Sequence, residues 1–332
     1  TKFAKIRPMK HSDLKKELKS FLKKAKNPLI VVLGPTASGK TALSIEIAHL
    51  VKGEIISTDS RQIYKGMEIG TDAISEKEQD GVPHHMLGIV TPDREFSLAE
   101  YKDEALKKIE EIKKRGNIPM LVGGTGLYIS SIIEEYDVPR IAPDKKLREK
   151  LYKEAEKHGN EYLHARLAKL DAASAEKIHP NNVRYVVRAI EINLLGGKNK
   201  TDKKKNKSPF DIFMVGLEWP RDELYERIDM RVDRQLERGL IDEVKKLLKK
   251  YDEDLPAMSS LGLKEIVPYI KGEKSLEECT EILKKNTRNY AKRQLTWFRR
   301  YKNINWIPCE TTKKPQKQKT QTAKKAERKP KK

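Results

Sequence analysis

Residues 34–41 have the sequence GPTASGKT, which fits the pattern G-x-x-x-x-G-K-[ST]. This loop lies between an apolar run, LIVVL at 29–33, and a helix-like run at 41–51, which is the strand–loop–helix context that the pattern requires. In such a loop, backbone N–H groups and the N-terminus of the helix form a cradle for a diphosphate. Lys40 would neutralise phosphate oxygens and Thr41 would ligate Mg²⁺. The pattern predicts a polyphosphate ligand but does not name a reaction.

A carboxylate follows the next apolar run. EIIST at 54–58 is typical of a buried strand, and Asp59 comes directly after it. An acid at this place completes the magnesium site of many phosphoryl-transfer enzymes. The same carboxylate, facing the cradle, could instead act as a general base, and an Asp in this position also often caps a turn or helix. The residues alone leave these three interpretations open.

A third apolar run, PMLV at 119–122, ends in Gly123, Gly124 and Thr125. The glycines would let the backbone approach a ligand, and Thr125 would offer a hydroxyl group to the cleft. Taken alone, the glycine pair is better explained by a simple tight turn. The two adjacent histidines His84 and His85 do not predict a metal site, because adjacent side chains diverge and no cysteine or carboxylate cluster accompanies them.

The alternation of strand-like and helix-like runs predicts an α/β fold with a parallel sheet, whose ligands bind at the carboxyl ends of the strands. We divide the chain into a basic N-terminal extension at 1–27, a core formed by 28–142 and 210–308, an all-helical insertion at 143–195, a flexible lysine-rich loop at 196–209 and a disordered basic tail at 311–332. Within the first segment, the spacing of Leu14, Leu18, Phe21 and Leu22 predicts an amphipathic helix over 11–25.

The net charge of +21 lies mostly at the two ends of the chain. Residues 1–27 contribute +8 and residues 311–332 contribute +9, so only +4 remains between them. The tail is either a solubilising segment or an arm that raises RNA affinity in a salt-dependent way. Inside the core, residues 284–302 combine eight basic residues with four aromatic ones. They form either an RNA-binding surface with stacking rings or an amphipathic helix whose rings are buried.

Two cysteines cannot build a disulfide framework, and no run of eighteen apolar residues predicts a membrane span. We therefore expect a soluble, cytoplasmic protein that does not contact a membrane. No obligate protein partner is predicted.

Six segments, taken together, resemble the bacterial tRNA dimethylallyltransferases, also called tRNA isopentenyltransferases. They are GPTASGKT at 34–41, STDSRQIYKGMEIGT at 57–71, LVGGTGLYI at 121–129, HPNNVRYVVRAIE at 179–191, RIDMRV at 227–232 and AKRQLTWFR at 291–299. The matching region spans about residues 29–308. The resemblance implies a P-loop NTPase-like parallel sheet flanked by helices, with an all-helical insertion domain that grips tRNA.

The resemblance also implies an activity: transfer of a dimethylallyl group from dimethylallyl diphosphate to N6 of adenine 37, beside the anticodon of tRNAs that read codons beginning with U. Asp59 would be the general base, and Thr125 would contact the reacting end of the diphosphate. The residues implied to bind the diphosphate are Gly34, Thr36, Ala37, Ser38, Gly39, Lys40, Thr41 and Arg231. Mg²⁺ is the implied cofactor, with Thr41 as its protein ligand.

The implied partner is the anticodon stem-loop of tRNA. The residues implied to contact it are Asp59, Ser60, Arg61, Gln62, Arg148, Arg184, Tyr185 and Arg188. Two other enzyme classes share the cradle and the acid. One is a P-loop kinase of a nucleotide or metabolite, and the other is a prenyltransferase that acts on free adenine nucleotides. An RNA-binding protein with a vestigial phosphate loop is a third, non-enzymatic alternative.

Overall fold

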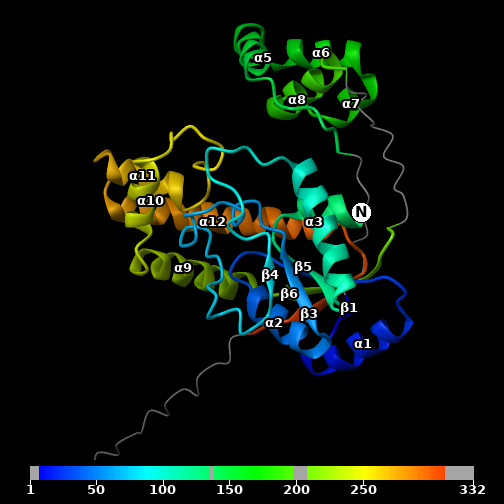
Figure 1. Cartoon of the computed structure of the whole chain (residues 1–332). Helices are drawn as coiled ribbons and strands as arrows, with labels where there is room; N and C mark the ends of the chain where they lie inside the picture. Colours follow the sequence, from blue (N-terminus) through cyan, green and yellow to red (C-terminus); the bar gives the residue numbers. More distant parts are fainter. Residues whose placement is uncertain (1–6, 135–137, 197–207, 311–332) are drawn as a thin grey trace, which may run out of the picture.

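The computed structural model describes residues 7–134, 138–196 and 208–310 (Figure 1). Most of the lysine-rich loop and the whole basic tail predicted above lie outside these residues. The described residues form a seven-stranded sheet with the order β1-β7-β6-β2-β5-β3-β4, in which every neighbouring pair is parallel. The strands are β1 (Arg7–Pro8), β2 (Pro28–Leu33), β3 (Gly53–Ser57), β4 (His84–His85), β5 (Ile118–Gly123), β6 (Asp211–Glu218) and β7 (Ile304–Pro308).

The predicted parallel α/β arrangement is confirmed, and its centre is β2 between β5 and β6. Side chains of β2 alternate between two apolar clusters, because successive residues of a strand point to opposite faces of the sheet. Val31 packs into the apolar cluster on one face, whereas Ile30 and Val32 pack into the cluster on the other face. Both faces are therefore buried, which explains the continuous apolar run in the sequence.

Helices cover both faces of the sheet (Figure 1). Helices α1 (His11–Lys24) and α2 (Lys40–Val51) cover one face, and α3 (Leu98–Lys114), α4 (Gly126–Ile133) and α12 (Leu276–Phe298) cover the other. Helix α12 also joins α9 (Arg221–Glu237), α10 (Leu240–Leu248) and α11 (Leu263–Ile270) in a third apolar cluster, together with Ile63 and Met67 after β3 and Val90 after β4. This lobe extends beyond the carboxyl edge of the sheet. Among the described helices, none has both the length and the apolar composition needed to cross a bilayer.

The N-terminal helix belongs to the packed core, whereas the sequence predicted an extension there. Leu14 and Leu18 are about 1% exposed and pack against β2 and α2. The preceding strand β1 pairs with β7 at the edge of the sheet. The predicted amphipathic spacing is confirmed, and burial of this apolar stripe is the reason that the segment docks despite its many lysines.

Four helices follow one another within residues 143–195, where the sequence predicts the insertion. They are α5 (Lys145–His158), α6 (Asn160–Leu170), α7 (Ala172–Lys177) and α8 (Val183–Leu194). Their apolar side chains form a cluster of their own, with Leu151, Leu163 and Leu167 at its centre. Figure 1 shows this group of helices set apart from the sheet. The insertion therefore has a separate small core.

A buried carboxylate organises the base of the insertion. Glu191 on α8 is fully buried, and it accepts hydrogen bonds from Arg148, Arg188 and the backbone N–H of Asp144. Burial by itself would raise the pKa of the Glu191 carboxyl group, but these hydrogen bonds lower it. Two of the arginines predicted to contact tRNA are thus already engaged in an internal ion pair. Their contact with tRNA stays a prediction.

We expect Glu191→Ala to destabilise the insertion by about 3 kcal/mol, because it leaves two partly buried guanidinium groups without their shared partner. Hydrogen–deuterium exchange of α5 and α8 measures this loss directly, while exchange in β2 and β5 should not change. Glu149→Ala removes an exposed acid from the same region and is the matched control. Equal exchange in both variants would show that the Glu191 ion pair does not hold the insertion together.

Candidate active site

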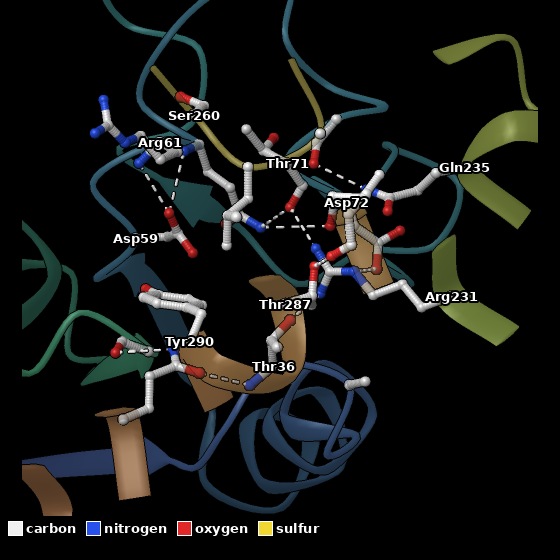
Figure 2. Close-up of a pocket in the computed structure, with 18 of the residues that line it drawn as sticks. Thr36, Asp59, Arg61, Thr71, Asp72, Arg231, Gln235, Ser260, Thr287 and Tyr290 are labelled. Carbon is white, nitrogen blue, oxygen red and sulfur yellow. Dashed lines mark hydrogen bonds and ion pairs between the residues drawn. The ribbon is translucent and has the colours of Figure 1, made fainter. Parts of the chain in front are cut away.

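A cavity of about 870 Å³ opens at the carboxyl edge of β2, β3 and β5 (Figure 2). Its walls come from the phosphate loop, residues 59–62, residues 70–72, helix α9, residues 259–264 and helix α12. Loops that follow parallel strands meet at this edge, as the sequence predicts. The pocket therefore joins segments that are far apart in the chain.

The phosphate loop presents its helix N-terminus to this pocket. Gly39 adopts a left-handed conformation (φ 93°) as the N-cap of α2, and Gly39, Lys40 and Thr41 all line the cavity. The first N–H groups of a helix have no partner within the helix, so they are available to an anion. Two carbonyl groups of the loop are held by other side chains: the Ala37 carbonyl accepts from Arg227 Nε and the Ser38 carbonyl accepts from Trp219 Nε1, each at 2.8 Å.

Lys40 carries a positive charge in a crowded electrostatic setting. Its Nζ donates to the Pro35 carbonyl oxygen at 2.7 Å. Burial, followed by the charge of Arg231, lowers the pKa of the Lys40 ammonium group from 10.5 to about 8, whereas Asp59 and Asp72 act to raise it. This pKa lies about one pH unit above neutrality, so Lys40 is mostly protonated at neutral pH.

Arg231 spans the pocket between the phosphate loop and residues 71–72 (Figure 2). Its guanidinium group donates to the Thr36 hydroxyl and to the Thr71 carbonyl oxygen, the latter at 3.2 Å. Asp72 lies 3.5 Å from Arg231 Nε and completes its surroundings. Because Arg231 and Lys40 both face the helix N-terminus, the pocket is suited to a multiply charged anion.

Asp59 has the capping role, which is one of the three that the sequence left open, and its role as a general base stays a prediction. Its Oδ1 accepts from the N–H groups of Arg61 (2.8 Å) and Gln62 (3.4 Å), which is the capping turn. Within the described residues, Oδ2 has no hydrogen-bond partner. Figure 2 shows the carboxylate on the same side of the pocket as the ring of Tyr290. One carboxylate oxygen thus shapes the loop, and the other is free to accept a proton.

Thr125 ties the loop after β5 to the loop after β3. Its hydroxyl oxygen accepts from the Ser60 N–H at 3.1 Å, and its own N–H donates to the Thr58 carbonyl at the same distance. Gly123 is required by this close approach, since a Cβ atom there would lie 2.4 Å from Thr58 Oγ1. The glycine therefore serves loop packing.

The sequence pattern of the IPP transferase family matches residues 62–301. The chain belongs to the IPP transferase family. It is similar to the tRNA dimethylallyltransferase of Acetivibrio thermocellus, with 49% identity over 84% of this chain and 91% of that protein. It is also similar to the tRNA dimethylallyltransferase of Bacillus subtilis, with 46% identity over 85% of this chain and 91% of that protein.

Two solved structures share the fold of this IPP transferase family member. One is a tRNA isopentenylpyrophosphate transferase of Bacillus halodurans, with 44% identity, a TM-score of 0.64 and coverage of 85% of this chain and 90% of that chain. The other is a eukaryotic dimethylallyltransferase acting on tRNA, with 30% identity, a TM-score of 0.74 and coverage of 85% and 74%. The P-loop-like sheet predicted from the sequence agrees with both.

The pocket brings together most, but not all, of the residues that the sequence assigned. Those that line it are Thr36, Ala37, Gly39, Lys40, Thr41, Arg231 and Asp59 to Gln62. Gly34 and Ser38 belong to the phosphate loop but do not line the cavity. Thr125 does not line it either, but it accepts a hydrogen bond from Ser60, which does. Arg148, Arg184, Tyr185 and Arg188 belong to the insertion and do not line this cavity. Arg184 and Tyr185 are exposed, and their contact with tRNA stays a prediction.

The aromatic residues of 284–302 are mostly structural, which contradicts the interpretation of that whole stretch as a stacking surface for RNA. Phe298 is fully buried, and Trp297 and Tyr301 pack against the same apolar cluster. Only Tyr290 lines the pocket. Burial and the charge of Asp59 raise the pKa of the Tyr290 phenol to about 12, so this hydroxyl group stays protonated.

Three residues that line the site, Asp72, Arg227 and Gln294, were not predicted from the sequence. Arg227 belongs to RIDMRV, Asp72 follows the GMEIGT stretch, and Gln294 belongs to AKRQLTWFR. These segments were recognised as matches, but nothing in their local pattern shows which side chain faces a ligand.

The donor set at this pocket fits Mg²⁺, although the described residues contain no group of three or more histidine, cysteine or acidic side chains that could hold a metal ion. Mg²⁺ prefers oxygen ligands and commonly takes most of them from substrate phosphates and water. The Thr41 side chain is exposed at the end of the helix that would hold the phosphates. Thr41 would supply one oxygen ligand beside those of a bound diphosphate.

The lowered pKa of Lys40 predicts pH-dependent anion binding. The protonated form binds the anion, so the Lys40 contribution to affinity is complete well below pH 8 and is lost as pH rises through 8. We expect the Kd of an alkyl diphosphate to rise by a factor approaching ten per pH unit between about pH 8 and 9.5. Isothermal titration calorimetry at several pH values measures this change. Lys40→Arg keeps its charge and should lose the dependence; the same slope in both proteins would assign it to another group.

Proposed function

We propose that this chain transfers a dimethylallyl group from dimethylallyl diphosphate to N6 of adenine 37 in cytoplasmic tRNAs that read codons beginning with U. The products are N6-isopentenyladenosine and diphosphate. The observation that carries the proposal is the pairing, in one pocket, of a phosphate loop with a carboxylate whose second oxygen is free. The names of the similar proteins support a tRNA acceptor and a five-carbon donor.

In this reaction Asp59 acts on the acceptor. The exocyclic nitrogen of adenine is a poor nucleophile because its lone pair is delocalised into the ring. As the new C–N bond forms and the C–O bond to the diphosphate breaks, the Asp59 Oδ2 atom takes the proton that N6 loses. General base catalysis of this kind contributes about 10² to 10⁴-fold. The hydrogen bonds to Oδ1 hold the carboxylate in place during the transfer.

The phosphate loop acts on the leaving group. Negative charge builds on the departing diphosphate, and the N–H groups at the start of α2, Lys40 and Arg231 are positioned to stabilise it. When bound, Mg²⁺ would be held by Thr41 and the phosphate oxygens, and it would supply further charge neutralisation. The loop then binds a prenyl diphosphate in the place where related loops bind ATP.

The acceptor base must leave its stack to reach the pocket, at a cost of a few kcal/mol that is smallest in a single-stranded loop. The cavity of about 870 Å³ is within the size range of small-molecule sites. Residues 60–62 and Tyr290 form the wall beside Asp59, so an everted base that enters there meets the carboxylate. An anticodon loop supplies such a base.

Carbon-labelled dimethylallyl diphosphate tests the proposed reaction. The label should appear in a tRNA with adenine at position 37 and be absent from the same tRNA with guanine there, and nucleoside mass analysis should show the isopentenyl product. Transfer from γ-labelled ATP alone would identify a kinase. Equal transfer to AMP would identify an enzyme of free nucleotides, and tight tRNA binding without turnover would leave only RNA binding.

We expect Asp59→Asn to lower the single-turnover rate by at least about a hundredfold, because the amide cannot accept the N6 proton. The remaining oxygen still accepts from the Arg61 and Gln62 N–H groups, so the loop keeps its shape. Affinity for tRNA should stay within about twofold of wild type. Asp93→Asn changes an exposed acid away from the pocket and is the control. An unchanged rate in Asp59→Asn would remove Asp59 as the base.

A further inference from the structure

A single buried amide connects the two loops that flank the reaction centre. Gln294, on α12, is about 5% exposed. Its Oε1 accepts from the Thr36 N–H at 2.8 Å, and its Nε2 donates to the Gly124 carbonyl oxygen at 3.0 Å. Thr36 belongs to the phosphate loop after β2, and Gly124 belongs to the loop after β5. The sequence reasoning assigned no role to Gln294.

The chemistry of this bridge is specific to a side chain that both donates and accepts. The Thr36 N–H requires an acceptor, and the Gly124 carbonyl requires a donor, so the amide can take only one orientation. Gln294 is almost completely buried, so little of the amide is accessible to water that could replace either bond. A Cβ atom at Gly124 would lie 2.0 Å from Nε2 of Gln294, so a larger residue there would displace the amide from the bridge.

The bridge has a further consequence for Thr36. Because its N–H group is already used by Gln294, and its hydroxyl accepts from Arg231, Thr36 is held from two sides. The loop after β5 continues from Gly124 to Thr125, whose hydroxyl holds the Ser60 N–H next to Asp59. A short chain of hydrogen bonds thus runs from the phosphate loop through Gln294 to the loop of the general base.

We propose that Gln294 is a positioning residue, which sets the distance between the diphosphate and the group that deprotonates the acceptor. The proposal rests on the proposed function, because it concerns the alignment of donor and acceptor in that reaction. Gln294 acts through the two loops that it connects. A displacement of about 1 Å in such an alignment can cost on the order of a hundredfold in rate, so this bridge affects kcat more than substrate binding.

Gln294→Met tests the bridge with a side chain of similar length that can neither donate nor accept as an amide does. We expect kcat to fall by about 10- to 100-fold, with the KM for dimethylallyl diphosphate and the Kd for tRNA within about threefold of wild type. Thr296→Val, an exposed position on the same helix whose hydroxyl bonds only the Lys292 carbonyl, is the control. Thermal melting of each variant separates a rate effect from unfolding.

Gln294→Glu supplies a readout that loss of packing would not give. A protonated carboxyl group can accept from Thr36 and donate to Gly124, as the amide does, whereas a carboxylate cannot donate. The ratio of this variant's kcat to that of wild type should therefore rise as pH is lowered from 8 to 6, while the ratio for Gln294→Met stays flat. A glutamate variant as active as wild type throughout, beside an impaired methionine variant, likewise supports the bridge.

Two results would overturn the role of Gln294: a Gln294→Met enzyme with wild-type kcat, or glutamate and methionine variants impaired equally at every pH. Wild-type enzyme in the same assay distinguishes these results from failure of the proposed function. If the wild type transfers no label to tRNA, the reaction itself is wrongly assigned. If the wild type is active and either of the two overturning results is obtained, only the role of Gln294 is wrongly assigned.

Discussion

The loops at the carboxyl edge of the sheet must satisfy their backbone hydrogen bonds while leaving one set of N–H groups for an anion. A buried N–H or carbonyl group without a partner costs free energy comparable to a lost hydrogen bond. Here the carbonyls of Ala37 and Ser38 are capped by Arg227 and Trp219, and the Thr36 N–H is taken by Gln294. What remains free is the start of α2. The rest of the site is arranged around this division.

The same constraint explains why several pocket residues do more than one thing. One oxygen of Asp59 holds the turn at residues 61–62, and the other faces the pocket. Arg231 connects two loops before it meets any ligand. Charges that are fixed in advance by such contacts need little reorganisation during a reaction, which is the main source of electrostatic catalysis.

The insertion is built on a different principle. Its four helices bury their own apolar cluster and use the Glu191 ion pair at their base. In the sheet-containing part, by contrast, long-range contacts between β2, β5 and α12 bring the pocket together. A helical unit with its own core can change without disturbing the pocket, because its helices pack mainly against one another and none of them lines the cavity.

The sequence by itself determined the parallel α/β fold, the phosphate loop and the acid that follows β3, because each is encoded locally. Apolar runs predict buried strands, and the spacing of Gly34, Gly39 and Lys40 predicts the cradle. Tertiary structure alone decided which members of the other segments face the pocket. Gln294 and Trp297 lie three residues apart on one helix, yet one bridges two loops of the site and the other packs against Gly126. Their partners are more than 160 residues away in the chain, and no local pattern records contacts at that separation.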